Sequence, residues 1–330
     1  MKLVQYFDGH IVINLFGLLI RIKHSFKYKC PEVKECGVAE NPEKIVVSLT
    51  SFPQRINIVV KTIKTLLTQT KKPDVVVLWL APEQFPDGEA DLPQELLDLK
   101  QYGLTIDWYK DIRSYKKIIP TIKKYPNSVI ITTDDDIYYA PDTIETLYNS
   151  YLGHKNEVQA HRCDWLKLVE DEKPVIARSD GRSGRRSNSP EQTACNHTYN
   201  DSKKTIKWEK TRELYLDKHR GQASYHNRLT GYGAVLYPPN CFYKDVCDEE
   251  LIKNTIPTHD DVWLWAMTIL NGYKTRLVKG YSESINYVED SQQYGLCKIN
   301  KKGVGMSLEE AYEIITKQYP QIIEILESEE

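Results

Sequence analysis

The sequence predicts an α/β protein whose central sheet is mostly parallel and carries helices on both faces. Over residues 45–147, apolar β-branched runs alternate with amphipathic segments, which is the pattern of strands joined by crossover helices. One of these runs, at 128–133, ends in three consecutive aspartates, and open parallel sheets bind their ligands at the carboxyl ends of their strands. A chain of 330 residues is long enough to bury the core that such a sheet requires.

Each of the first four predicted strands is a run of apolar and β-branched residues. In chain order these strands are expected at 45–52, 75–80, 104–109 and 128–133. The segments between them have helical periodicity, and helices are expected at 58–70, 92–103 and 111–126. Gly103 closes the second of these helices, and Pro120 interrupts the third.

The pattern continues beyond the aspartates, where Pro141 and Asp142 are typical of the start of a helix. Further elements are expected at 156–162 (strand), 229–242 (glycine-rich strand), 258–272 (helix) and 308–318 (helix). Ser307 and Glu310 have the spacing of a capping box at the start of the last helix. The sequence has neither a GxGxxG nor a GxxxxGKS loop, which argues against a Rossmann dehydrogenase and a P-loop enzyme.

The composition is that of an ordinary globular protein. Lys and Arg number 44 and Asp and Glu number 46, so the net charge of −2 provides no basic field for a nucleic acid. The seven cysteines include no CxxC pair, which argues against a zinc site or a disulfide framework and favours a reducing compartment. The 22 tyrosines are compatible with a sugar or nucleotide site, but tyrosines also fill cores.

The N-terminal segment 1–43 is expected to be an apolar and basic helix followed by a linker. The apolar run at 11–20 is too short to cross a bilayer, which takes about 20 residues. No charged stretch precedes the run, so we expect no secretory signal and predict a cytoplasmic protein. Two interpretations remain open for 11–29: a peripheral contact with the inner face of the membrane, or a helix packed on the domain or on another subunit.

The most informative motif is the run Asp134, Asp135 and Asp136 at the end of the fourth strand. Three adjacent carboxylates repel one another, and a divalent cation is their natural partner because hard cations take carboxylate and phosphate oxygens. The alternative is a solvated acidic turn that caps the next helix, since aspartate is common in loops.

The stretch TTDDDIYY, at 132–139, resembles the DxD element of metal-dependent glycosyltransferases with the GT-A fold, especially the β1,3-galactosyltransferase-like group. The resemblance covers about 45–285 and implies a Rossmann-like GT-A fold with a nucleotide-sugar donor. It also implies Mn²⁺ or Mg²⁺ bridging the donor diphosphate to the carboxylates. By the same resemblance, Asp136 is the direct metal ligand, and Asp134 and Asp135 hold the metal and the ribose.

The resemblance assigns further residues to the donor. Thr50, Ser51 and Arg55 match the loop after the first strand, which holds the base and ribose in that fold. Arg55 would stack on uracil or pair with a phosphate, and the alternative is a surface arginine. Lys117 matches a basic residue near the nucleotide and is a candidate phosphate contact, although a solvated helix face would explain it equally well.

The acceptor side is expected in two places. Residues 178–230 are polar, rich in Gly and Ser and locally basic, and they are predicted to be a variable acceptor-side insertion or simply a solvated loop. Three of its arginines would suit an anionic acceptor: Arg182, Arg185 and Arg186. Gly231 and Gly233 flank Tyr232, where the missing side chains allow a ligand to approach closely or mark a bulge. The resemblance assigns Gly231, Tyr232 and Gly233 to the acceptor and sugar pocket.

A second acidic pair, Asp260 and Asp261, falls in the first turn of the helix predicted from 258. Capping by Thr258 and the helix dipole are enough to explain both acids. The pair also resembles the E/D-D-V motif of the galactosyltransferase-like group, which provides a catalytic carboxylate. Asp261 is then the general base that accepts the proton of the acceptor hydroxyl, and Asp260 is its neighbour or an acceptor contact.

The predicted architecture is therefore a catalytic domain at 44–285 and a C-terminal loop and helix at 286–330. Basic residues in that loop would close over the diphosphate or simply be solvated: Lys298, Lys301 and Lys302. The predicted activity is metal-dependent transfer of a hexose from a nucleotide-sugar, expected to be a UDP-sugar. The acceptor would be a glycan or a lipid-linked oligosaccharide in bacterial surface polysaccharide synthesis. An inverting mechanism follows by analogy with the acidic pair, and a retaining one stays open.

Two other classes of function are considered. A nucleotidyltransferase has a similar sheet and carboxylate-bound Mg²⁺, but it usually carries a glycine-rich basic loop, and residues 50–55 contain no glycine. A non-catalytic nucleotide- or glycan-binding protein on the same fold would be indicated by the loss of either acidic cluster, and both clusters are present.

Overall fold

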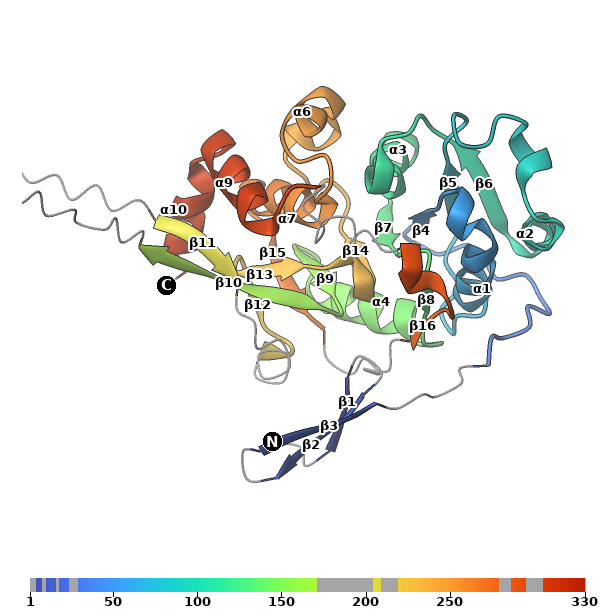
Figure 1. Cartoon of the computed structure of the whole chain (residues 1–330), viewed down its shortest axis with the longest axis horizontal. Helices are drawn as coiled ribbons and strands as arrows, with labels where there is room; N and C mark the ends of the chain where they lie inside the picture. Colours follow the sequence, from blue (N-terminus) through green and yellow to red (C-terminus); the bar gives the residue numbers. More distant parts are fainter. Residues whose placement is uncertain are drawn as a thin grey trace, which may run out of the picture.

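The computed structural model of the chain describes residues 4–7, 10–15, 18–23, 29–170, 204–208, 219–278, 286–294 and 305–329. Its main feature is an eight-stranded sheet with strand order β12-β15-β9-β14-β7-β4-β5-β6 (Figure 1). These strands are β4 (Ile45–Thr50), β5 (Val75–Leu80), β6 (Leu104–Trp108), β7 (Val129–Thr132), β9 (Glu157–Ala160), β12 (Ala223–Ser224), β14 (Val235–Tyr237) and β15 (Lys274–Leu277).

The central sheet is mostly parallel, as predicted. Strand β4 pairs in parallel with both β5 and β7, β5 pairs in parallel with β6, and β9 pairs in parallel with β15. Strand β14 is antiparallel to both of its neighbours, and β12 is antiparallel to β15. The order β6-β5-β4-β7 is the 3-2-1-4 order of a doubly wound sheet, so the predicted Rossmann-like α/β class is confirmed.

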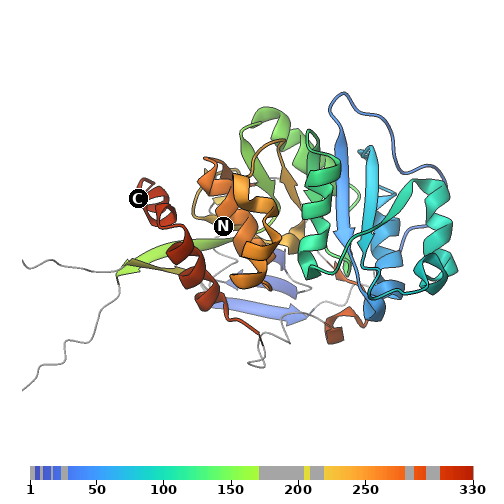
Figure 2. The same ribbon diagram turned by 90° about the horizontal axis from the view of Figure 1, so that it is seen from above.

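Helices cover both faces of the sheet because each strand places alternate residues on opposite sides. On β4, the side chains of Ile45, Val47 and Leu49 join the core under α1 (Ile56–Leu66), α2 (Gln94–Asp98) and α4 (Thr143–Gly153). A second core contains side chains of β7, β9 and β14 and of α3 (Ile119–Lys124), α6 (Glu249–Asn254), α7 (Asp260–Leu270), α9 (Leu308–Gln318) and α10 (Gln321–Glu327). Figures 1 and 2 show α9 and α10 at one end of the molecule and α2 at the other.

Short 3-10 helices connect these elements: η1 (Pro53–Arg55), η2 (Gly88–Asp91), η3 (Leu99–Tyr102), η4 (Arg113–Lys117), η5 (Gly231–Gly233), η6 (Lys244–Cys247) and η7 (Ser291–Tyr294). Gly103 ends the α2–η3 segment at φ +107°, a left-handed conformation that glycine adopts without strain. The predicted break at Pro120 is also present, since η4 ends before this proline and α3 begins with it in its first turn. The capping box of Ser307 and Glu310 forms at the start of α9, as predicted.

Two smaller sheets flank the large one. Strand β10 (Cys163–Glu170) pairs with β11 (Lys204–Trp208) and with β13 (Asn227–Leu229), and β8 (Ile137–Tyr138) pairs with β16 (Asn286–Tyr287). The prediction of a loop throughout 178–230 is therefore wrong for β11, β12 and β13. The run Lys-Thr-Ile-Lys-Trp of β11 alternates polar and β-forming residues, a strand signal that the surrounding polar sequence masked. The three arginines predicted to meet an anionic acceptor lie outside the described residues.

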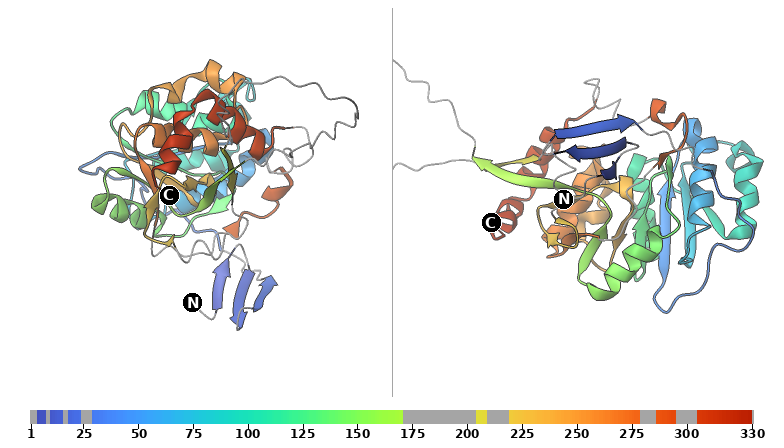
Figure 3. Two further views of the ribbon diagram at one scale, coloured as in Figure 1. Left: turned by 90° about the vertical axis from the view of Figure 1, so that its left-hand side faces the viewer. Right: turned by 90° about the horizontal axis from the view of Figure 1, so that it is seen from below.

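Residues 4–7, 10–15 and 18–23 of the N-terminal segment are strands, so the helix predicted there is wrong for these residues. Strands β1 (Val4–Phe7), β2 (His10–Leu15) and β3 (Leu18–Lys23) form an antiparallel sheet that lies outside the large sheet (Figure 3). The dipeptides Asp8-Gly9 and Phe16-Gly17 separate the strands in sequence, and such glycine-containing pairs between β-branched runs favour hairpins. The membrane contact expected through 11–29 stays a prediction, although the apolar helix on which it was based is replaced by strands in the described residues. No helix of the described ranges is long and apolar enough to span a bilayer.

The predicted linker lies on the domain surface without regular secondary structure. Its backbone donates hydrogen bonds from Gly37 N to Tyr102 O, at 2.8 Å, and from Ala39 N to Pro73 O, at 2.9 Å. A Cβ at Gly37 would lie 2.4 Å from the backbone oxygen of Leu67, so a residue with a side chain would force the linker away from α1.

Candidate active site

The predicted site residues gather at the carboxyl ends of β4 and β7, which are neighbours in the sheet. After β4 the chain crosses to β5, which lies on one side of β4. On the other side of β4 lies β7, and the next strand beyond β7 is the antiparallel β14. The direction of winding therefore changes between β4 and β7, and open α/β sheets bind ligands in the crevice at such a point. The loop after β4 brings in Ser51 and Arg55, and the loop after β7 brings in the three aspartates.

Asp135 is held by the loop after β4. Its two carboxylate oxygens accept hydrogen bonds from Ser51 Oγ and from Arg55 Nη1, both at 2.6 Å. The side chains of Asp135 and Arg55 are buried, so the alternative of a surface arginine is wrong. Burial raises the pKa of Asp135, while Arg55 and Ser51 oppose that change. This carboxylate therefore fixes the aspartate turn against the β4 loop.

Asp136 has a different set of contacts. Its Oδ2 atom lies 3.0 Å from Arg55 Nη2 and accepts a hydrogen bond from Gln292 Nε2 at 2.9 Å. Its backbone oxygen accepts a bond from Val288 N at 2.8 Å. Burial, followed by the charges of Asp135 and Asp134, raises the pKa of Asp136 to about 7 although Arg55 opposes them. Asp135 and Asp136 are both buried, so the alternative of a solvated acidic turn is wrong.

Lys117 joins the two acidic motifs. Its Nζ atom donates a hydrogen bond to Asp134 Oδ1 at 2.9 Å and lies 3.0 Å from Asp260 Oδ2. The side chain is buried, so the alternative of a solvated helix face is wrong. Burial lowers the pKa of Lys117, but the nearby carboxylates, Asp134 first, raise it well above its usual value. Lys117 is therefore a buried cation between the aspartate turn and the start of α7.

The N-terminal turn of α7 is not capped as predicted. The N-cap residue is His259, which makes no side-chain capping bond, and the Thr258 hydroxyl is buried without a hydrogen-bond partner in the described part of the chain. Tertiary contacts replace the capping box, because Asp260 faces Lys117 and Asp261 Oδ1 accepts a bond from Gly231 N at 3.0 Å. Capping by Thr258 thus does not account for the two acids.

Asp261 differs from Asp260 in its exposure and in the direction of its pKa shift. Its side chain is 29% exposed, whereas the side chain of Asp260 is 12% exposed. Burial, and then the charge of Asp260, raise the pKa of Asp261 to about 7, and Lys117 and Arg228 oppose this change. The pKa of Asp260 is lowered, because its pairing with Lys117 outweighs its burial. The pKa values of the two acids are therefore shifted in opposite directions, which is the pattern of a general base beside a carboxylate that stays charged.

Gly231 lies where these groups meet. A Cβ at this position would lie 2.9 Å from Lys117 Nζ, 3.2 Å from Asp134 Oδ1 and 3.3 Å from Asp261 Oδ1. At Gly233, a Cβ would lie 2.8 Å from Arg162 Cγ. Between the glycines, the Tyr232 ring lies 4.3 Å from the Arg162 guanidinium. Glycine at these positions thus makes room for neighbouring side chains of the protein.

Thr50 is the predicted donor residue with the weakest connection to this centre. Its hydroxyl donates a hydrogen bond to Trp79 O at 2.8 Å, which ties β4 to β5 at the same edge of the sheet. Among the described residues, no hydrogen bond joins its side chain to the aspartate turn.

Several groups at the site could not be identified from the sequence. Gln292 on η7 contacts Asp136, Arg228 on β13 lies 3.9 Å from Asp261, and Asp164 on β10 pairs with Arg228. Lone Gln, Arg and Asp residues in polar segments carry no motif, so no sequence signal pointed to them. The lysines expected to cover the diphosphate, at 298, 301 and 302, lie outside the described residues.

The side chains at this site that could bind a metal ion are carboxylates. Among the described residues, no three His, Cys, Asp or Glu side chains are grouped so that they could hold a metal ion by themselves. Five carboxylates lie at the site beside three buried cations, Arg55, Lys117 and Arg228. Burial first, and then the charges of Asp135 and Asp134, raise the pKa of Asp136. Mg²⁺ commonly takes one or two carboxylates together with substrate phosphates. Asp134 and Asp136 have the chemistry for such a shared site, and in this structure each is paired with a cation, Asp134 with Lys117 and Asp136 with Arg55.

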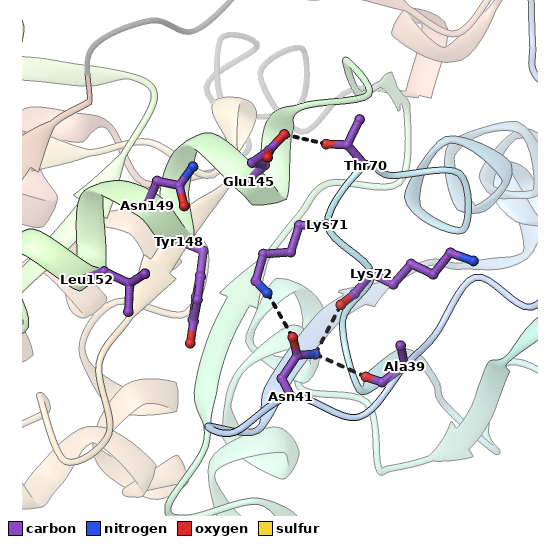
Figure 4. A pocket seen from close by; sticks show the side chains of 9 residues that line it. All are labelled: Ala39, Asn41, Thr70, Lys71, Lys72, Glu145, Tyr148, Asn149 and Leu152. Carbon is purple, nitrogen blue, oxygen red and sulfur yellow. Dashed lines mark hydrogen bonds between the residues drawn. The ribbon is translucent and has the colours of Figure 1, made fainter.

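A separate surface groove of about 500 Å³ lies away from these residues, next to the segment that leads into β5 (Figure 4). It is formed by the linker, the residues before β5 and the side of α4, and it includes Asn41, Lys71 and Tyr148. None of the predicted site residues lines it.

Comparisons with known proteins give structural likenesses only. No protein-family model matches the sequence, and no match is found among curated proteins. Solved structures with some likeness include the mannosyltransferase PcManGT from Pyrobaculum calidifontis in complex with GDP-Man and Mn²⁺, with a TM-score of 0.46 and 11% identity over 89% of this chain and 77% of that chain. Residues 1–349 of S. aureus TarS match with a TM-score of 0.37 and 12% identity, over 86% of this chain and 70% of the other. The inositol-1-phosphate CTP transferase from T. maritima matches with a TM-score of 0.36 and 12% identity, over 80% and 98% of the two chains. Each TM-score is below 0.5, so none of these likenesses assigns a function to the chain.

Proposed function

We propose that the protein is a metal-dependent glycosyltransferase that moves a sugar from a nucleotide-sugar to a glycan or lipid-linked acceptor. One observation carries the proposal. Lys117 joins the aspartate turn after β7 to the acidic pair of α7, with contacts of 2.9 Å and 3.0 Å, at the switch point of the sheet. These contacts support the proposal because they bring Asp134, a proposed metal ligand, close to Asp260, whose neighbour in the chain is Asp261, the proposed base.

The donor would occupy the crevice between the carboxyl ends of β4 and β7. Asp134 and Asp136 would hold Mn²⁺ or Mg²⁺, which supplies Lewis-acid stabilisation of the departing diphosphate. Lys117 would supply further positive charge to the diphosphate side, since its Nζ atom already contacts Asp134. Ser51 and Arg55 fix the turn through Asp135, which keeps the metal-binding carboxylates in place.

Asp261 would act as the general base. The acceptor hydroxyl gives its proton to the Asp261 carboxylate as its oxygen attacks the anomeric carbon. The bond between that carbon and the diphosphate oxygen breaks, and the nucleoside diphosphate leaves with the electron pair. A carboxylate with a pKa of about 7 is well matched to this step near neutral pH. The single displacement would invert the anomeric centre.

The remaining parts of the proposal are the cellular setting and the sugar. The free cysteines of the described residues support a reducing compartment: Cys30, Cys36, Cys163, Cys241 and Cys247. On this basis we propose a cytoplasmic reaction. The further proposal, that the donor is a UDP-hexose and the product a surface polysaccharide, rests on the resemblance of TTDDDIYY at 132–139 alone.

Donor hydrolysis tests this proposal. A panel of nucleotide-sugars would be incubated with the protein in Mn²⁺, in Mg²⁺ and in EDTA, and nucleoside diphosphate would be measured. We expect release from one donor, only with metal. Release of pyrophosphate from a nucleoside triphosphate would indicate a nucleotidyltransferase instead. The absence of both activities and of metal-dependent nucleoside diphosphate binding would refute the glycosyltransferase.

A pair of variants tests the base. Asp261→Asn removes the proton acceptor but keeps the shape, and we expect the turnover number kcat to fall at least about 100-fold. Asp248→Asn is the matched control, because Asp248 caps α6 through a bond to Leu251 N at 2.9 Å and asparagine is an equally good cap. Equal turnover in the two variants would remove Asp261 from the mechanism.

A further inference from the structure

We propose that Arg228 is a positioning residue for Asp261, held in place by Asp164, in the sugar transfer proposed above. Arg228 lies on β13 directly opposite Asp164 on β10, and the two side chains form a buried ion pair across the strands. From this position the Nη1 atom of Arg228 lies 3.9 Å from Asp261 Oδ2. One guanidinium thus faces a structural carboxylate and the proposed base together.

The Arg228 guanidinium has hydrogen-bond donors that its ion pair with Asp164 does not use. Its Nε atom is buried and has no hydrogen-bond partner in the described part of the structure. The Tyr312 hydroxyl of α9, whose side chain is 1% exposed, is likewise buried without a partner among those residues. Buried polar atoms are normally hydrogen-bonded, so each exception needs an explanation, and a role at a functional site is one of them. Arg228 is therefore fixed at Asp164 through Nη2, while its Nη1 lies near Asp261 and its Nε is not used by the ion pair.

The arrangement holds Asp261 from two sides. Gly231 N donates to Oδ1 at 3.0 Å, and Arg228 stands near Oδ2. A carboxylate with one fixed oxygen can still rotate about its Cβ–Cγ bond, and the second contact limits that rotation. The charge of Arg228 also favours the ionised form of Asp261, which is the form that accepts a proton.

Two substitutions separate this role from a structural one. Arg228→Lys keeps a charge beside Asp164 but loses the planar fork that faces two carboxylates. Arg228→Met removes the charge as well. Arg276→Met is the matched control, because Arg276 on β15 forms another arginine–carboxylate pair, with Glu157 at 3.1 Å, away from the site.

For Arg228→Lys we expect kcat for sugar transfer to fall about 10-fold or more, and for Arg228→Met about 100-fold, as misplacement of a catalytic group by about 1 Å would cause. The affinity for nucleoside diphosphate and metal should stay within about threefold of the wild type, since Arg228 contacts none of the proposed donor residues. Arg276→Met should leave kcat unchanged. A folded Arg228→Lys protein with wild-type kcat would overturn the proposal, as would an equal loss in the control.

Crystal structures of the wild-type and Arg228→Lys proteins provide a second readout that does not need activity. We expect the Asp261 carboxylate to rotate or shift in the variant, and an unchanged Asp261 would overturn the proposal. This readout also separates the two hypotheses. Failure of the wild-type protein to act on any donor counts against the glycosyltransferase, whereas an active wild type with an indifferent Arg228 counts against the positioning role alone.

Discussion

Replacement of Gly231 by alanine should damage the site far more than the fold. The added Cβ would lie 2.9 Å from Lys117 Nζ, where ordinary contacts begin at 3.4 Å, so the ammonium must move by about half an ångström. Lys117 cannot move freely, because its Nζ atom is tied to Asp134 at 2.9 Å and to Asp260 at 3.0 Å. The new methyl group also crowds the oxygen of Asp261 that Gly231 N binds.

The magnitudes follow from these contacts. Overpacking of this kind costs about 1–3 kcal/mol, and the loss of glycine flexibility in the unfolded chain returns roughly 0.4–1 kcal/mol. The melting temperature should therefore fall by only a few degrees, at about 2–4 °C for each kcal/mol. Catalysis should fall about 10- to 100-fold, because the displaced groups are the proposed base and the cation beside the diphosphate.

The assay compares kcat/KM for sugar transfer with the melting temperature in Gly231→Ala and in Gly153→Ala. Gly153 is the control because a Cβ there would meet nothing within 4 Å. Its replacement should leave kcat/KM unchanged and the melting temperature equal or slightly higher. Wild-type kcat/KM in Gly231→Ala would show that the close contacts around Gly231 do not matter, and the reasoning from them would fail.

Three further predictions concern the charges of the site. Arg55→Met should lower the free energy of unfolding by about 3–5 kcal/mol, because it leaves the buried Asp135 carboxylate without its partner; chemical denaturation measures this, and a loss below about 1 kcal/mol would contradict it. After EDTA has removed bound metal, an excess of Mn²⁺ should raise the melting temperature of the wild type but not that of Asp136→Asn. Equal increases in the two proteins would show that the ion binds elsewhere. The pKa of Asp261 is raised to about 7 in the folded protein, so this acid releases its proton at a lower pH in the unfolded chain. As pH rises from about 4 to 7, the free energy of unfolding of the wild type should therefore fall relative to that of Asp261→Asn, by at most about 1.4 kcal/mol per pH unit. Above about pH 7 the difference should stay constant. If the free energies of unfolding of the two proteins change in parallel with pH, the raised pKa is contradicted.

The parts of the fold that could be predicted are those specified by local patterns. Strands β4 to β7 are short, β-branched apolar runs, and Gly103, Pro120 and Ser307 mark helix boundaries where the structure has them. The N-terminal run is ambiguous because a short apolar segment fits a helix and a strand equally well, and the Asp8-Gly9 dipeptide favours a hairpin there. Periodicity alone could not decide that case.

The contacts of the site could not be predicted, because they join positions that are distant in the sequence. The sequence placed carboxylates at the end of β7 and at the start of α7, but the partnership of Lys117 with Asp260 depends on how α7 packs on the sheet. At Thr258 the local sequence favours a helix cap, but the cap does not form, and Asp260 and Asp261 make tertiary contacts at the start of α7. Arg228 and Gln292 lie in segments without any motif, and only the fold brings them to Asp261 and Asp136.

The hydrogen bond between Arg55 Nη2 and Ser291 O, at 3.3 Å, spans 236 positions of the chain and has a consequence for folding. The contacts of η7 with Arg55 and Asp136 close the longest loops of the site, and such contacts form late because their entropic cost must be met first. During synthesis, β4 to β7 can pair long before residues 286–294 leave the ribosome. The aspartate turn therefore reaches its final arrangement only after residues 286–294 have been made, and a chain that stops before them would hold the paired strands β4 to β7 without a completed site.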